Sequence, residues 1–202
     1  MTTESMYTDA NNLALPNYEV FNIAQPQEHS VLKKPGLLLN FPLCTEDLMD
    51  IKILEAKFEQ EQNCSGLAAP QIGISKRIIV FAAPENPQFK KWRPDFTQTM
   101  PKTIWINPSY EPIGTEQHED YEACFSVAEM AGPVKRYKTI HYRAYDVAGQ
   151  LITGSAEGFL ARIIQHETDH VHGILFIDLV AEGKLLPINE YRRRRQEALA
   201  SE

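Results

Sequence analysis

Two histidines four residues apart, with a glutamate after the first, form the clearest chemical motif of the sequence. The run from His166 through Glu167 to His170 follows the pattern H-E-x-x-H. Because an α-helix has about 3.6 residues per turn, both imidazoles would lie on one helix face, close enough to bind one metal ion. Glu167 would lie beside the first ligand, where it can take a proton from a water that the metal activates. The motif therefore indicates metal-dependent hydrolysis.

The same pattern can also arise by chance on a solvent-exposed helix face. Here the predicted helix, from Glu157 to about His170, is amphipathic, and Phe159 and Ile163 fall on the same face as the two histidines. Histidines on an apolar face are expected to be buried, and a buried pair needs a partner. This periodicity favours the metal site.

A catalytic metal site of this kind requires a third protein ligand. A metallopeptidase with the extended motif would have a third histidine at position 176, where this chain has Phe176. Glu182 and Glu190 are alternatives downstream, but they lie in a polar tail. Cys124 is a further candidate, and it belongs to a segment that carries a family resemblance.

Three segments, in one order, resemble the peptide deformylase family. They are Cys64-Ser-Gly66-Leu-Ala-Ala-Pro-Gln71, Glu122-Ala-Cys124-Phe-Ser126 and Gln165-His-Glu-Thr-Asp-His170. The family patterns are G-x-G-x-A-A-P-Q, E-G-C-L-S and H-E-x-x-H, and three motifs in order are far more specific than one. The resemblance extends over roughly residues 30–180. It implies hydrolysis of the N-formyl group from formyl-methionyl peptides of nascent proteins, with release of formate.

The resemblance also implies a role for each residue of the site. Cys124, His166 and His170 would bind one divalent metal ion, usually Fe²⁺ in the family, with Ni²⁺, Co²⁺ or Zn²⁺ as substitutes. Glu167 would act as general base and then as general acid. The side-chain amide of Gln71 and the backbone N–H of Phe125 would stabilise the negative charge that develops on the formyl oxygen.

Other residues would position the peptide and the metal ligands. Gly66 would let the substrate backbone come close and add to the protein as a strand. Glu122 would pair with Arg136 and hold the loop of Cys124. Both roles are implied by the family and by the residues that match its motifs.

This chain departs from the family pattern at four positions of the first two motifs, namely Cys64, Ser65, Ala123 and Phe125. By the resemblance, Ser65 and Arg162 would line the pocket for the first side chain of the substrate, with Asp120 nearby. These residues predict a more polar pocket than usual. The alternative function is therefore a deformylase-like hydrolase with altered N-terminal residue specificity or reduced activity, unless the changes are neutral.

The elements that must position these residues can be read from periodicity and turn signals. The sequence predicts an α+β fold in which mixed or antiparallel strands wrap around the central metal-binding helix, with a C-terminal helix. The expected elements are a helix from Thr45 to about Gln60, strands at 77–81, 103–107, 138–145 and 151–154, a loop insertion at 83–102, and a last helix from Asn189 to Ala200. Residues 1–28 are expected to form an N-terminal arm, and 29–202 a single catalytic domain.

Composition limits the other classes of function. The net charge of −7 argues against a nucleic-acid-binding protein. The three cysteines fit a reducing compartment rather than a disulfide framework. Neither a signal peptide nor an apolar segment of about 20 residues is apparent, so we expect a cytoplasmic protein with no membrane contact.

Two other functions compete with deformylation. One is a zinc metallopeptidase that cuts internal peptide bonds; the missing third histidine and the presence of Cys124 argue against it. The other is a binding module that has kept the fold and lost activity, which the intact Gln71, Glu167 and ligand set argue against.

One basic segment stands out in this acidic chain. Tyr191-Arg-Arg-Arg-Arg195 lies in the predicted C-terminal helix. The family acts on N-formylated nascent peptides, so this helix is a candidate for ribosome association. The alternative is a solvated helix end whose arginines pair with nearby acids.

Overall fold

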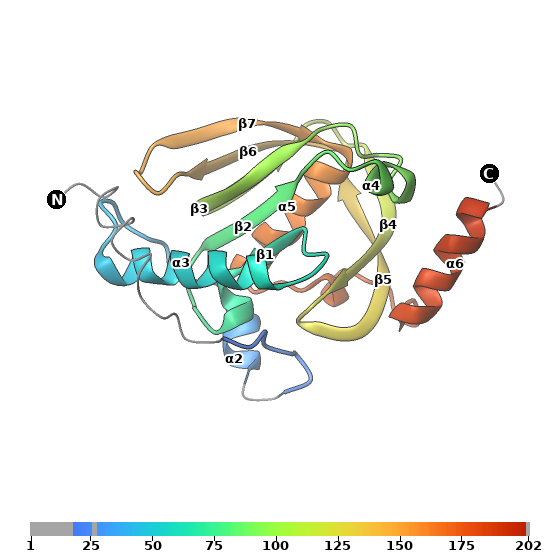
Figure 1. Ribbon diagram of the computed structural model, residues 1–202, viewed down its shortest axis with the longest axis horizontal. Helices are drawn as coiled ribbons and strands as arrows, with labels where there is room; N and C mark the ends of the chain where they lie inside the picture. The colour runs from blue at the N-terminus through green and yellow to red at the C-terminus, as the bar shows by residue number, and fades with distance from the viewer. Residues whose placement is uncertain (1–17, 26–27, 201–202) are drawn as a thin grey trace.

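The computed structural model describes residues 18–25 and 28–200 and shows an α+β fold (Figure 1). The expected N-terminal arm, residues 1–28, lies largely outside the described residues. The helices are α2 (His29–Leu32), α3 (Thr45–Gln60), α4 (Pro87–Trp92), α5 (Gly158–Val171) and α6 (Ile188–Ala200), with 3-10 helices η2 (Ala69–Ile72) and η3 (Phe176–Asp178). The strands are β1 (Gly66–Ala68), β2 (Ile78–Ala83), β3 (Met100–Pro112), β4 (Gln117–Cys124), β5 (Val127–Tyr137), β6 (Thr139–Tyr145), β7 (Leu151–Glu157) and β8 (Leu186–Pro187).

The larger sheet is antiparallel and has the strand order β1-β2-β3-β6-β7. Its second strand, β2, lies between β1 and β3 and is apolar and almost completely buried. Because successive side chains of a strand point to opposite faces, Ile79 and Phe81 pack in the cluster with α5, whereas Ile78 and Val80 pack in the cluster with α3. The sheet is therefore covered by α3 on one face and α5 on the other.

The smaller sheet has the order β4-β5-β8 and is also antiparallel. Its long β4–β5 hairpin lies on the other side of α5, which contacts strands of both sheets (Figure 1). The predicted α+β fold, with strands around a central helix and a helix at the C-terminal end, is thus confirmed. The sequence analysis did not predict the hairpin itself, although it carries Cys124 at the end of β4.

The predicted loop insertion at 83–102 was wrong in part. Residues Pro87–Trp92 form the short helix α4, and β3 already begins at Met100. Two of the predicted strands, those at 103–107 and 151–154, proved clearly shorter than the observed ones, because β3 continues to Pro112 and β7 to Glu157. In contrast, the helix from Thr45 to Gln60 was predicted correctly, and those at 157–170 and 189–200 to within one residue at each end.

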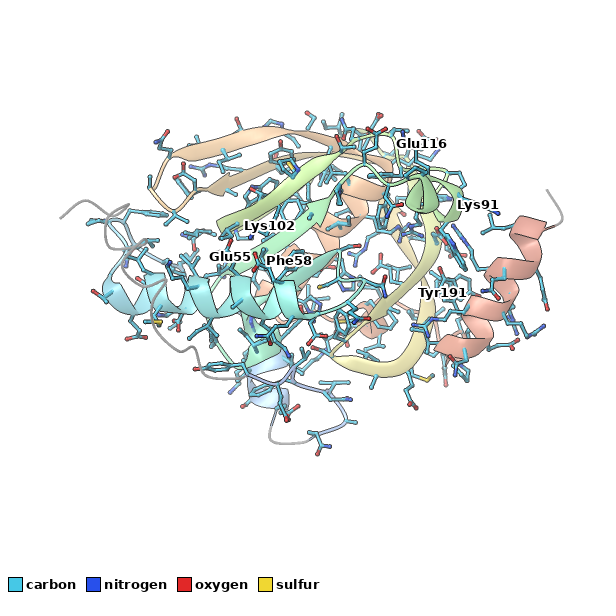
Figure 2. All side chains as sticks on the ribbon, viewed as in Figure 1. Glu55, Phe58, Lys91, Lys102, Glu116 and Tyr191 are labelled. Atoms are coloured by element: carbon cyan, nitrogen blue, oxygen red, sulfur yellow. The ribbon has the colours of Figure 1, made fainter. Side chains whose placement is uncertain are left out.

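The last helix, α6, packs beside α4 and the β4–β5 hairpin (Figure 1). Tyr191 of α6 stacks on Tyr121 of β4, with ring centroids 5.1 Å apart, and its side chain lies between α6 and the hairpin (Figure 2). Within the described part of the chain, each helix is too short or too polar to cross a lipid bilayer.

Candidate metal centre and catalytic cavity

The two histidines of the H-E-x-x-H motif lie on the face of α5 that meets the β4–β5 hairpin. Their Nε2 atoms are 3.2 Å apart. His170 is almost fully buried, and burial lowers its pKa well below the ordinary histidine value, with the neighbouring His166 lowering it further. His170 is therefore neutral, which is the form that binds a metal ion.

Cys124 reaches the same point from the end of β4. The strand register shifts between Ala123 and Cys124, where the hairpin turns into β5. This bulge directs the thiol inward, and Cys124 Sγ lies 3.3 Å from His170 Nε2. The structure thus brings together the three side chains that the sequence proposed as ligands.

The three side chains fit a four-coordinate transition-metal site. One donor atom from each of Cys124, His166 and His170 lies within 4.8 Å of the others. Usual Zn–N and Zn–S bond lengths in a tetrahedral site imply donor–donor distances of about 3.3–3.6 Å, close to the 3.2 and 3.3 Å observed. By contrast, the alternative ligands Glu182 and Glu190 are not part of this group.

Glu122 organises the side chains behind the metal centre. It accepts two hydrogen bonds of 2.9 Å from Arg136, one of 2.7 Å from Arg162, and one of 2.8 Å from His166 Nδ1. Burial opposes its charge, but the hydrogen bonds from His166 and Arg136 hold the pKa of Glu122 well below its usual range. Because Nδ1 of His166 is engaged with this carboxylate, its Nε2 faces the metal centre.

Asp169 and Tyr110 extend this network, and the sequence analysis gave neither a role. Asp169 accepts a hydrogen bond from Arg136 Nη1 and one of 3.4 Å from the Tyr110 hydroxyl. The signal that could have identified Asp169 is its helical position, because residues 162, 166 and 169 lie on one face of α5. Asp169 thereby holds Arg136 from the side opposite Glu122.

Glu167 lies at a buried position beside the proposed metal ligands. Its side chain is buried, and in the described structure its Oε2 has no hydrogen-bond partner. Burial raises the pKa of Glu167 to about 7. A carboxyl group with such a pKa can both accept and return a proton near neutral pH.

Gly66 makes room for the carboxylate of Glu167. A Cβ atom added to Gly66 would lie 2.5 Å from the carboxyl carbon of Glu167 and 2.6 Å from its Cγ. No side chain can therefore replace Gly66 without moving Glu167. The sequence analysis explained this glycine by a close approach of the substrate, and the structure shows in addition a close approach of the Glu167 carboxylate.

Replacing Gly66 by alanine is expected to reduce turnover by on the order of a hundredfold, because a displacement of about 1 Å in a catalytic group has an effect of that size. The metal content should stay at the parent level, since no ligand is touched. Formate release, metal content and thermal unfolding measured on one preparation would test this. An equal loss of metal and activity would show that Gly66 supports the metal centre instead.

Gln71 is held with its amide directed at the cysteine loop. Its Oε1 accepts a 2.9 Å hydrogen bond from the Ala68 backbone N–H. Its Nε2 lies 3.3 Å from Cys124 Sγ and 3.2 Å from Ser126 Oγ. Gln71 is also buried at 1% exposure, so it is not a loop amide that points into solvent. Ser126, like Asp169 and Tyr110, is a residue of the site that the sequence analysis left without a role.

The N-terminal segment joins the two loops that carry these groups. The Phe21 N–H donates to the Gln71 carbonyl at 2.6 Å, and the Ile23 N–H donates to the Ser126 carbonyl at 2.8 Å. The Phe21 ring also lies against Gly73, which ends η2 in a left-handed conformation. The described part of the predicted arm, although it has no helix or strand, thus braces the site.

A cavity of about 680 Å³ lies at this site. Its walls include Cys124, Glu167, Gln71, Gly66 and the partly exposed Phe125. This volume is within the usual range for a small-molecule or peptide side-chain site. Cys124, His166 and Glu167 therefore border a space that is large enough for part of a peptide.

Ser65 and Arg162 also line this cavity, as the sequence analysis expected. The guanidinium of Arg162, however, donates to Glu122 and to the backbone carbonyls of Val134 and His118. Asp120 is likewise occupied, because it accepts hydrogen bonds from Arg93 and Arg195. The charged side chains that were predicted to make the pocket more polar are thus paired with other groups of the protein. Arg162 is therefore not available to attract an acidic substrate group.

A thiolate and two imidazoles beside a buried carboxylate define a metal-dependent hydrolase, and comparisons with known proteins specify its kind. The profile of the polypeptide deformylase family matches residues 23–185. Peptide deformylase 2 of Rickettsia conorii is 56% identical over 194 residues, covering 95% of this chain and 96% of that protein. Peptide deformylase 1 of Nitrosomonas europaea is 41% identical over 152 residues, covering 72% of this chain and 84% of that protein.

Solved structures agree with this assignment. The Met-Ala-Ser-bound class I type b peptide deformylase of Acinetobacter baumannii superposes with a TM-score of 0.70 at 26% identity, covering 82% of this chain and 99% of that one. The peptide deformylase of Thermotoga maritima gives a TM-score of 0.66, also at 26% identity, covering 82% of this chain and 99% of that one. The chain belongs to the polypeptide deformylase family.

Proposed function

We propose that this enzyme hydrolyses the N-formyl group of formyl-methionyl peptides and releases formate. One observation carries the proposal: Cys124, Glu167 and Gln71, which belong to three separate motifs, line a single cavity. The Met-Ala-Ser peptide bound by the Acinetobacter relative is the product expected from formyl-Met-Ala-Ser. A short peptide beginning with methionine is therefore a fitting substrate class.

Cys124, His166 and His170 would hold the metal ion. A thiolate with two neutral imidazoles suits a borderline or soft divalent ion, and we propose Fe²⁺, with Ni²⁺, Co²⁺ or Zn²⁺ able to replace it. When bound, such an ion supplies Lewis-acid chemistry, because it polarises the formyl carbonyl and makes water more acidic. The carboxylate of Glu122 would keep His166 in the tautomer that binds metal.

Glu167 would move the proton. Its carboxylate would accept the proton of the attacking water and then pass it to the nitrogen of the departing amine. The raised pKa, about 7, suits both steps. A bound cation would lower that pKa and so favour the base form before reaction.

Gln71 and Phe125 would stabilise the charge on the formyl oxygen. The Gln71 side chain is oriented by the Ala68 N–H, so its amide donor is already directed toward Cys124. The Phe125 backbone N–H would supply the second donor from the same turn. Preorganised donors of this kind contribute about 10²–10³-fold to turnover.

We further propose that the enzyme acts on nascent peptides in the cytoplasm. Cys44, Cys64 and Cys124 are all free thiols, as a reducing compartment would maintain them. We do not extend the proposal to ribosome association through α6, because the exposed Arg193 and Arg194 pair with acids of their own helix.

Formate release from formyl-Met-Ala-Ser, measured anaerobically on protein of known metal content, tests the proposed function. Acetyl-Met-Ala-Ser is the matched control, because it differs by one methyl group. We expect the formyl peptide to be hydrolysed much faster. Equal hydrolysis of both, or cleavage of internal peptide bonds, would instead identify a metallopeptidase, and metal-loaded protein without any turnover would indicate a binding module.

A further inference from the structure

The inner face of helix α6 forms part of the catalytic cavity. Tyr191, Arg192 and Gln196 line the same space of about 680 Å³ as Cys124 and Glu167. The family profile ends at residue 185, so α6 lies beyond the segment by which the family is recognised. A wall built from α6 can therefore give this chain a preference that the shared motifs do not determine.

Three contacts fix α6 against the body of the protein. Tyr191 stacks on Tyr121 of the β4–β5 hairpin. Arg195 donates a 3.1 Å hydrogen bond to Asp120 and another to the carbonyl of Trp92 in α4. Figure 2 shows Tyr191 on the side of α6 that faces this hairpin. Arg192 and Gln196 each follow one of the packed residues, Tyr191 and Arg195, and are four residues apart. They therefore share the neighbouring face of α6, and the packing of α6 sets their position at the cavity.

The four consecutive arginines of α6 are not equivalent. Arg193 pairs with Glu190 and Glu197, and Arg194 pairs with Glu190. Arg195 pairs with Asp120. Arg192 alone, among these four and within the described residues, makes no ion pair or hydrogen bond. It is exposed and stands at the cavity wall.

The other arginines of the cavity are paired inside the protein. Arg93 pairs with Asp120 and lies over the Phe159 ring, while Arg162 pairs with Glu122. Glu167 is the buried proton acceptor proposed above. Among the arginines that line the cavity, Arg192 is therefore the one whose guanidinium has no partner within the described residues, and its charge is positive.

We propose that Arg192 is a specificity residue that binds a carboxylate of the formylated peptide, beyond its first residue. The proposal rests on the proposed deformylase function. A guanidinium is a planar fork of donors that matches a carboxylate in two parallel hydrogen bonds. The carboxylate can come from an acidic side chain at the second or third residue, or from the C-terminus of a short peptide.

Paired peptides that differ only in charge test this proposal and separate the two sources. The first pair is formyl-Met-Glu-Ser-amide and formyl-Met-Gln-Ser-amide, and the second has Asp or Asn at the third residue. The third pair is formyl-Met-Ala-Ser with a free or an amidated C-terminus. In at least one pair, the acidic member should have a kcat/KM about two- to fivefold higher, as for an exposed ion pair.

The preference should have three further properties. It should reside in KM, since a contact remote from the reacting bond is made equally in the ground and transition states. It should weaken as ionic strength rises, because the pair is exposed. It should disappear in Arg192→Gln and reverse in Arg192→Glu, which would favour a lysine-containing peptide. The matched control is Arg194→Gln, which removes an equal charge from the same helix and should keep the preference.

A parent enzyme that hydrolyses acidic and amide peptides equally well would overturn the proposal, as would a preference that survives in Arg192→Gln. Failure of the proposed function would look different, because no peptide of the panel would release formate. Calorimetric binding of the unformylated peptides to metal-loaded parent and Arg192→Gln proteins does not depend on turnover. Equal affinities for Met-Glu-Ser-amide and Met-Gln-Ser-amide, with the other pairs also equal, would likewise overturn it.

Discussion

Replacing Cys124 by alanine is expected to remove the metal ion and reduce formate release to background. The variant loses the thiolate, which is the only anionic donor among the three proposed ligands. Two imidazoles alone bind a divalent transition ion much more weakly than three ligands that include a thiolate. His166→Ala and His170→Ala should have the same effect, because each leaves two donors. Metal content by elemental analysis and formate release, measured on the same samples, would check this.

Cys44→Ala is the matched control for the cysteine variant. Cys44 lies at the exposed start of α3, where its thiol contacts Asp47, and it has no contact with the metal centre. This variant should keep both the metal and the activity of the parent. Full metal content in Cys124→Ala would disprove the assignment of Cys124 as a ligand, and a matched loss in Cys44→Ala would indicate a general effect of removing thiols.

The helix α5 could be predicted from the sequence because its signals are local. The spacing of Phe159, Ile163, His166 and His170 gives both the helix and the direction of its buried face. The same periodicity brings the two imidazoles together without knowledge of any other element. For this reason the metal-binding half of the site was accessible from one segment of the chain.

The strand that carries Cys124 could not be found in this way. The buried face of β4 bears Asp120 and Glu122 instead of apolar side chains. Alternating hydrophobicity, which is the signal for a half-buried strand, is therefore absent from β4. These carboxylates can be buried only because arginines from other elements pair with them, and such distant pairing is not visible in a local pattern.

The arginines illustrate the same limit. Arg162 and Arg192 both line the cavity, and the family resemblance drew attention to Arg162 alone. The structure shows Arg162 paired with Glu122 and leaves Arg192 without a partner among the described residues. Which guanidinium can act on a substrate depends on which carboxylates the fold places nearby. The position of an arginine in a sequence motif does not show whether its guanidinium is free to bind a substrate.

The short helix α4 has a signal that was available in the sequence. It begins with Pro87, and proline is favoured in the first turn of a helix, where its missing N–H is not needed. Residues 83–102 contain four prolines, and the sequence analysis predicted only a loop insertion there. At the end of α4, the Trp92 carbonyl accepts a hydrogen bond from Arg195, and this bond helps to position α6.

Replacing Glu167 by glutamine is expected to keep the metal and the fold while reducing turnover by about 10²–10⁴-fold, the usual contribution of a general base. Glutamine has nearly the same shape as glutamate, so the space beside Gly66 remains filled. It cannot accept the proton of the attacking water. Because burial raises the pKa of Glu167, a buried carboxylate is costly there. The metal-free variant should thus unfold at the same temperature as the parent or at a higher one.

Metal content, melting temperature and single-turnover formate release distinguish this role from a structural one. Glu119→Gln is the matched control, because Glu119 is an exposed glutamate of β4 outside the catalytic cavity. It should behave as the parent in all three measurements. Parent-level turnover in Glu167→Gln would exclude Glu167 as the base. A loss of metal in Glu167→Gln would show that this carboxylate supports the ion. If the proton acceptor alone is missing, we expect slow turnover, full metal content and an unchanged or higher melting temperature.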